Sequence, residues 1–171
     1  MRAFSWLLAF GLAAAPGRVI TFDNEQLGQT PSQWTVAMTN HGRAPRWEIV
    51  KDLTAATQPY VFAQISADPV RDRFPLAIFN DATFRDGDVS VRIKPVSGRE
   101  VQAGGIVWRY RDPNNYYLAR ANALEKNVQV FMDHRRILQG WDNTFLTSGK
   151  VGLWTVADSV TYFDEFRFTP K

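Results

Sequence analysis

The chain has 171 residues, of which 45% are hydrophobic and 13% aromatic, so it is long enough to bury the core of one domain. This composition excludes an intrinsically disordered protein. The absence of cysteine excludes disulfides and thiolate metal sites. The formal net charge is only +3 and no Lys/Arg-rich run occurs, which excludes a nucleic-acid partner that binds through a basic surface.

The N-terminus has the pattern of a short signal peptide. Arg2 is followed by an apolar run from Ala3 to Ala15 and then by Pro16 and Gly17. The run is too short for a helix that spans a bilayer. We therefore predict a signal peptide over residues 1–17, a secreted or periplasmic protein, and no membrane insertion after cleavage. The alternative is a buried N-terminal strand or helix.

Residues 18–171 are predicted to form one all-β domain. Short apolar runs recur with turn signals between them, and no window shows helical periodicity. This pattern is typical of a jelly-roll β-sandwich of two antiparallel sheets. The expected strands are Val19–Phe22, Trp34–Met38, Trp47–Val50, Tyr60–Ser66, Phe74–Phe79, Asp88–Pro95, Lys150–Thr155 and Ser159–Thr169, together with a central meander.

The meander covers Ala103–Met132 and is predicted to contain three strands joined by two tight turns. Pro113 presets φ for the first turn, and the Asn residues that follow tolerate the left-handed region. A second turn falls at Glu125–Asn127. The apolar face of such a meander needs a second sheet to cover it.

Alternation of side chains along these strands predicts a polar surface. Because an unpaired charge is costly to bury, Arg92, Arg109 and Arg120 are expected on the outer face of three neighbouring strands, beside Tyr116 and Asn122. Arginine offers paired donors to carboxylates or vicinal hydroxyls, and tyrosine stacks on sugar rings. We therefore predict that these five residues bind carbohydrate.

The alternative for this surface is an ordinary solvated sheet face. Antiparallel sheets commonly keep one face in water. The arginines would then pair with Glu100, Asp112 or Glu125 and contribute little.

The acidic and imidazole side chains do not form a recognisable catalytic or zinc site. A retaining glycosidase needs two carboxylates close together, whereas Asp164 and Glu165 are adjacent on one expected strand and point to opposite faces. His41 and His134 lie far apart in polar segments, and zinc needs more ligands.

Oxygen ligands near the two ends of the chain suggest a calcium site. Asp23, next to Asn24, and Asp164 are hard ligands that would meet where the termini of a sandwich come together. The alternative is that these residues cap turns. No other cofactor is predicted.

Four stretches carry a family resemblance: TFDN at 21–24, RFPLAIFNDATFRDGDVSVRIKPVSG at 73–98, AGGIVWRYRDPNNYYLARANALEKNVQVF at 103–131 and GKVGLWTVADSVTYFDEFRF at 149–168. Together they resemble the concanavalin A-like (laminin-G-like) jelly rolls of exported bacterial proteins, including the 3-keto-disaccharide hydrolase domain. The chain departs from that pattern after Val130, where strands of such domains are missing as if by an internal deletion. A deletion would expose a strand edge and apolar inner faces.

The resemblance indicates the fold more specifically than the activity, because lectins, glucanases and adhesion domains share it. Our first hypothesis is an exported carbohydrate-binding module with no catalysis of its own. The second is a hydrolase of 3-keto-disaccharides or related glycosides. The third is a structural or adhesion module of the cell envelope. The sugar and the oligomeric state are left open.

Overall fold

The computed structural model describes residues 16–122, 127–132, 135–136 and 144–171. Most of the predicted signal peptide, residues 1–15, lies outside this part. The described residues form strands and no helix, so none of their elements is a helix able to cross a membrane. The strands are β1 (Arg18–Ile20), β2 (Trp34–Thr39), β3 (Trp47–Lys51), β4 (Tyr60–Gln64), β5 (Phe74–Phe84), β6 (Gly87–Ser97), β7 (Ala103–Asp112), β8 (Asn115–Asn122), β9 (Asn127–Met132), β10 (Arg135–Arg136), β11 (Gly149–Thr155) and β12 (Val160–Pro170).

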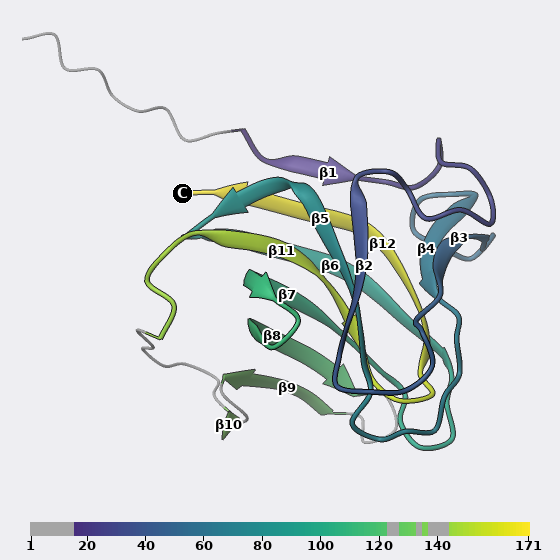
Figure 1. The fold of residues 1–171 in the computed structure, drawn as a ribbon. Coiled ribbons are helices and arrows are strands. Elements are labelled where there is room, and N and C mark those ends of the chain that lie inside the picture. Colours follow the sequence, from purple (N-terminus) through teal and green to yellow (C-terminus); the bar gives the residue numbers. More distant parts are fainter. Residues whose placement is uncertain (1–15, 123–126, 133–134, 137–143) are drawn as a thin grey trace, which may run out of the picture.

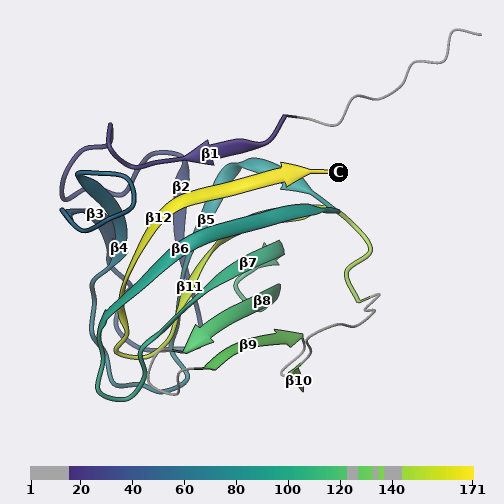
Figure 2. The ribbon, with the colours of Figure 1, turned by 180° about the vertical axis from the view of Figure 1, so that it is seen from behind.

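The strands form two antiparallel sheets, which confirms the predicted all-β sandwich (Figures 1 and 2). The larger sheet has the order β10-β9-β8-β7-β11-β5-β2. In the smaller sheet β12 is central, with β1 and β4 on one edge, β3 beyond β4, and β6 on the opposite edge. The expected deletion after Val130 falls within β9, which pairs with β10. Residues 133–134 and 137–143 lie outside the described part.

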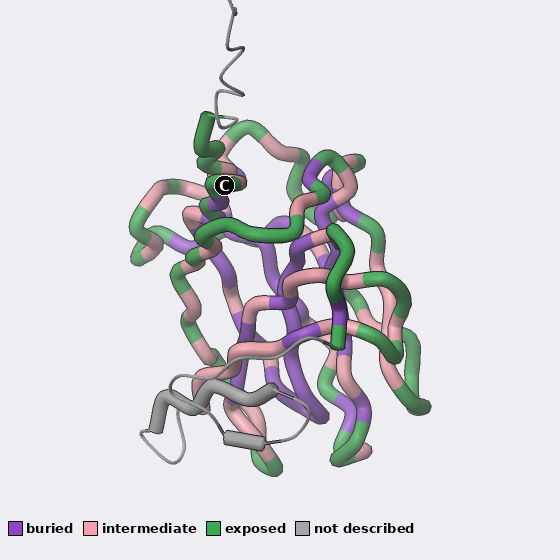
Figure 3. Tube along the Cα trace, turned by 90° about the vertical axis from the view of Figure 1, so that its left-hand side faces the viewer, coloured by how far each residue is buried: buried purple, intermediate pink, exposed green. Residues whose placement is uncertain are grey.

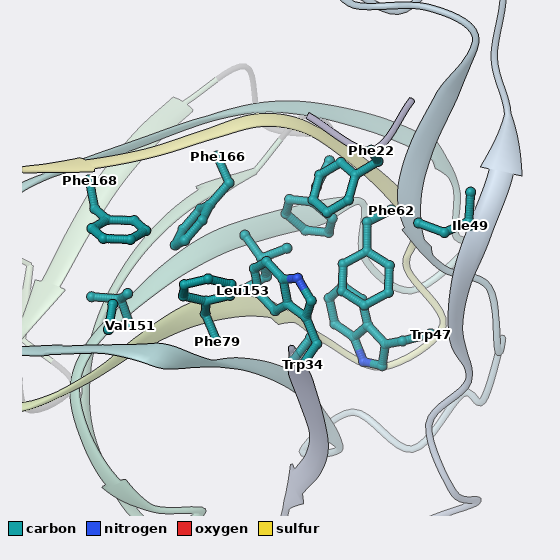
Figure 4. Packing of buried hydrophobic residues seen from close by; sticks show 13 residues of the cluster. Phe22, Trp34, Trp47, Ile49, Phe62, Phe79, Val151, Leu153, Phe166 and Phe168 are labelled. Carbon is teal, nitrogen blue, oxygen red and sulfur yellow. The ribbon is translucent and has the colours of Figure 1, made fainter. Parts of the chain in front are cut away.

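Aromatic rings fill the space between the sheets (Figure 4). Trp34 lies near the middle, with its ring centroid 5.1 Å from that of Phe62 and 5.3 Å from those of Phe79 and Phe166. These residues come from both sheets and are buried, as Figure 3 shows for the strand centres in general. Their burial removes apolar surface from water and so stabilises the packing of the two layers.

The larger sheet curls enough to enclose a second buried cluster on its other face. Leu76, Val107 and Trp154 belong to this cluster, although they point away from the core between the sheets. The curl brings the end of β2 to the β7–β8 turn. There the Thr39 hydroxyl donates to the carbonyl of Pro113 and contacts the Tyr116 hydroxyl at 2.9 Å. These contacts join β2 to β8 and its preceding turn across the intervening strands β5, β11 and β7.

The prediction that Arg92, Arg109 and Arg120 lie on three neighbouring strands is wrong. β6, which carries Arg92, belongs to the smaller sheet, whereas β7 and β8 pair in the larger sheet. The chain changes sheet in the connection between Ser97 and Ala103. Side-chain alternation shows which residues share a face of a strand, but it does not show which strands are neighbours.

Candidate functional site: a cavity on the curled sheet

The curl of the larger sheet leaves a cavity of about 440 Å³ on the face opposite the sandwich core. It is bounded by the end of β2, the start of β5, the β7–β8 turn, β8, β11 and the segment before β11. The described residues that line it are Thr39, Phe74, Asn114, Asn115, Tyr116, Leu118, Arg120, Thr144, Phe145 and Trp154. The lining therefore combines several rings with amides, hydroxyls and one guanidinium.

The strand register explains the shape of the wall. Leu76 of β5 is opposite Trp154 of β11, Trp154 is opposite Gly105 of β7, and Gly105 is opposite Arg120 of β8. A Cβ atom at Gly105 would lie 2.6 Å from the carbonyl oxygen of Ala119. Glycine is therefore required here, because any side chain would collide with β8, which approaches β7 closely between Trp154 and Arg120.

Two hydroxyls form the rim on the β2 side. Because the Thr39 hydroxyl donates its hydrogen to Pro113, the Tyr116 hydroxyl must be the donor in the contact between Thr39 and Tyr116. Burial raises the pKa of Tyr116, and the hydrogen bond with Thr39 opposes this only in part. Tyr116 is therefore a neutral phenol at physiological pH, half-buried in the cavity wall.

The indole of Trp154 forms the floor. Its side chain is 2% exposed and stacks on Phe74, with ring centroids 5.6 Å apart and an interplanar angle of 28°. The indole N–H makes no well-aligned hydrogen bond, although its proximity to the Tyr116 hydroxyl tends to lower the pKa of that group. A buried donor without a good acceptor is costly, and an acceptor on a bound molecule would offset that cost.

Three of the five residues predicted to bind carbohydrate share one strand face here. Tyr116 and Arg120 both line the cavity. Asn122 lies two residues beyond Arg120, on the same face of β8 by alternation. Arg120 and Asn122 also interact elsewhere in the chain.

Arg109 lies elsewhere because β7 is irregular at this residue. Its φ of 49° is in the left-handed region, and the register between β7 and β8 shifts between Trp108 and Asp112. The guanidinium packs 5.8 Å from the ring centroid of Tyr117 and forms an ion pair with Asp86 at 3.0 Å. It lines a separate cavity of about 440 Å³ between the sheets, near Trp108. A bulge of this kind redirects a side chain without a clear sequence signal.

Arg92 is paired on the outside of the smaller sheet. Its partner is Glu165 of β12, and Glu165 also accepts a hydrogen bond of 2.6 Å from Arg167. These two cations hold the pKa of Glu165 below its ordinary value. Arg92 is therefore ion-paired on a solvated sheet face, as in the alternative interpretation of this surface. Its partner, Glu165, was not among the partners expected from the sequence.

The contacts of Asp23 and Asp164 are those of turn capping. Asp164 is 4% exposed and accepts hydrogen bonds from the backbone N–H and the hydroxyl of Thr57, at 2.7 and 2.6 Å. Asp23 accepts the N–H of Tyr60 at 3.3 Å. Within the described ranges, no group of three or more His, Cys, Asp or Glu residues is placed to hold a metal ion. Both carboxylates therefore cap the segment before β4.

Several cavity residues were not selected from the sequence. Trp154 and Phe74 were predicted only as parts of strands, Thr39 only as part of a polar connection, and Asn114 and Asn115 only as turn residues. Their convergence depends on the curl of the sheet, which no local pattern encodes.

Comparisons of the chain with protein-family models, with curated proteins and with solved structures gave no match.

Proposed function

We propose that the protein is a carbohydrate-binding β-sandwich module that holds a saccharide in the cavity of the curled sheet and has no catalysis of its own. The observation that carries the proposal is the convergence of aromatic rings, amides, hydroxyls and Arg120 around one open cavity of about 440 Å³. Export to the periplasm or the cell exterior, as the N-terminal pattern predicts, belongs to the same proposal.

The chemistry of the lining suits a sugar. A saccharide presents apolar C–H faces, which pack on rings, and polar edges, which need hydrogen bonds. Phe74 and Tyr116 are half-buried and supply ring surface, whereas Trp154 and Arg120 supply N–H donors. A few polar groups in a mostly apolar wall are the usual composition of a small-molecule site.

The hydrolase alternative would require a nucleophile or a general acid at the cavity. Among the described residues that form the cavity there is no Asp or Glu to serve as nucleophile or general acid. The adjacent pair predicted to be unsuitable is engaged elsewhere: Asp164 with Thr57, and Glu165 with Arg92 and Arg167. The lowered pKa keeps Glu165 ionised, so it has no proton to donate near neutral pH.

A binding screen tests the proposal. The chain is titrated with a panel of mono- and oligosaccharides, and binding is followed by calorimetry and by tryptophan fluorescence, since Trp154 is in the cavity. We expect at least one saccharide to bind without being cleaved, and Phe74→Leu to weaken it about tenfold by removing ring surface. Tyr162→Leu, on the smaller sheet, is the matched control and should leave affinity unchanged.

Other outcomes contradict the proposal in distinguishable ways. Turnover of a keto-disaccharide that the Phe74→Leu change abolishes would support the hydrolase. If no saccharide of the panel binds, the carbohydrate-binding proposal is wrong and the structural or adhesion module is the remaining hypothesis.

A further inference from the structure

We infer that β6 is an interface between two copies of this chain, in which the two β6 strands pair antiparallel across a two-fold axis. This interface lies on the smaller sheet and does not rest on the proposed function. Within the described residues β6 pairs with β12 alone, so its opposite side is an open edge of the sheet. β6 is 11 residues long, and a long open edge is a template for pairing with another chain.

The backbone of β6 presents hydrogen-bonding groups to this open edge. The N–H of Lys171 donates to the carbonyl oxygen of Asp86 at 2.8 Å, so the N–H and C=O of every second residue from Asp86 onward point to β12. Those of Val89 and Val91 therefore point to the open edge. Pro95 belongs to the same series, and proline without an N–H is typical of an edge position.

The inward face of β6 is apolar. Val89, Val91 and Ile93 are half-buried and pack against the sandwich core, and no charged residue of β6 interrupts this row. Natural edge strands often carry an inward-pointing charge that prevents pairing. Beside Val89, the half-buried Ile106 and Trp108 of the larger sheet line the cavity between the layers. A second β6 at the open edge would point the same apolar row towards the larger sheet.

The order of charges along β6 selects an antiparallel second copy. Asp88 lies near the start of the strand, whereas Arg92 and Lys94 lie in its second half, and all three are exposed. Antiparallel pairing sets the start of each strand opposite the second half of the other, whereas parallel pairing sets like charges side by side. With Arg92 on the axis, Arg92 would oppose itself. With Val91 on the axis, Asp88 faces Lys94 of the second copy, and Ser90 faces Arg92.

The ion pairs that these side chains already make are compatible with this pairing. Lys94 donates to Asp52 and to Thr54, each at 2.6 Å, and has a third N–H. Asp88 contacts Lys171 at 2.8 Å, and both side chains are more than half exposed. A carboxylate accepts several hydrogen bonds, so Asp88 keeps Lys171 when it also faces a lysine of the second copy.

A single cysteine tests the position of the axis, because the chain contains no cysteine of its own. In the Val91→Cys variant the two cysteines face each other with Cα atoms about 5.5 Å apart, which suits a disulfide. We expect oxidation of this variant to give a linked dimer that a reducing agent separates. Val89→Cys is the matched control, since its two cysteines would lie more than about 13 Å apart and should not link.

Sedimentation equilibrium of the full chain measures the association itself. We expect a reversible dimer that Ser90→Glu tightens and Ser90→Lys weakens, each about fivefold, because residue 90 faces Arg92 of the second copy. The same two changes at Thr83, an exposed residue of β5, are the control and should leave the dissociation constant unchanged.

Three results would overturn the inference. The first is a chain that stays monomeric at every concentration. The second is a dimer that Val91→Cys does not link, or that Val89→Cys links equally well. The third is an equal dissociation constant for the two Ser90 variants.

Discussion

At the scale of single residues, a buried arginine ties together segments that are distant in sequence. Arg73 is fully buried and donates to the carbonyl of Arg43 at 2.9 Å, to that of Ala157 at 3.0 Å and to the Ser66 hydroxyl at 2.6 Å. Asp68 lies 3.9 Å from its Nε atom and partly offsets its charge. Burial lowers the pKa of Arg73, yet arginine is basic enough to remain charged.

Arg73→Met should therefore be strongly destabilising. The change leaves several buried oxygens without donors, and we expect the free energy of unfolding to fall by about 3 kcal/mol. Urea unfolding followed by tryptophan fluorescence measures this. Arg71→Met is the control, because Arg71 is 82% exposed and its pair with Glu100 should contribute about 0.5 kcal/mol or less. Equal effects of the two changes would contradict a structural role for Arg73.

A second residue makes stability depend on pH. Hydrogen bonds from Lys94 and Thr54 lower the pKa of Asp52 to about 2, from an ordinary value of 3.8. The folded state thus binds a proton at Asp52 less readily than the unfolded state does. This contribution to stability is present above pH about 4 and is lost as pH falls towards 2.

The measurement is acid unfolding of the wild type and of Asp52→Asn. Asn cannot titrate, so the variant should be less stable near neutral pH, and the difference should shrink between pH about 4 and 2. A stability difference that stays constant over this window would show that Asp52 does not carry the pH dependence.

At the scale of the elements, alternation of side chains was reliable where a strand is regular and failed where it is not. It placed Tyr116 and Arg120 on one face of β8, as the structure has them. It misplaced Arg109, because the positive φ at that residue breaks the alternation of β7. It also could not show that β6 and β7 belong to different sheets, since strand pairing is set by long-range packing.

Gly104 controls how closely the two sheets approach. A Cβ atom at this position of β7 would lie 2.7 Å from Cγ2 of Ile93 and 2.9 Å from Cγ2 of Thr161, both in the smaller sheet. We expect Gly104→Ala to lower the free energy of unfolding by about 1–3 kcal/mol, because the layers must separate or the side chains leave their rotamers. Thermal melts test this. An unchanged melting temperature would mean that the layers adjust at no cost.

At the scale of the whole molecule, the two layers differ in extent. Within the described part of the chain, β6 pairs with β12 alone and forms an edge of the smaller sheet. β8 and β9 of the larger sheet continue past this edge (Figure 2). The inner-face residues Ile106, Trp108 and Ala119 are only half-buried, and with Val89 they line the cavity between the layers. Within the described residues, this side of the larger sheet is therefore covered less completely than its centre.

Uneven coverage should produce uneven local stability. β5, β11 and β12 contain fully buried residues such as Phe79, Leu153 and Phe163. Their amides should exchange with solvent only through global unfolding, whereas those of β6 and β8 should exchange earlier through local opening. Hydrogen exchange of residues 18–171 resolved by peptide measures the difference, with the concentration of protein varied. If the amides of β6 and β8 are as well protected as those of β5, β11 and β12 at every protein concentration, another part of the same chain covers the inner face of the larger sheet beside β6. Protection that rises with concentration would show that a second copy covers it, because an uncovered strand edge and apolar inner face favour association.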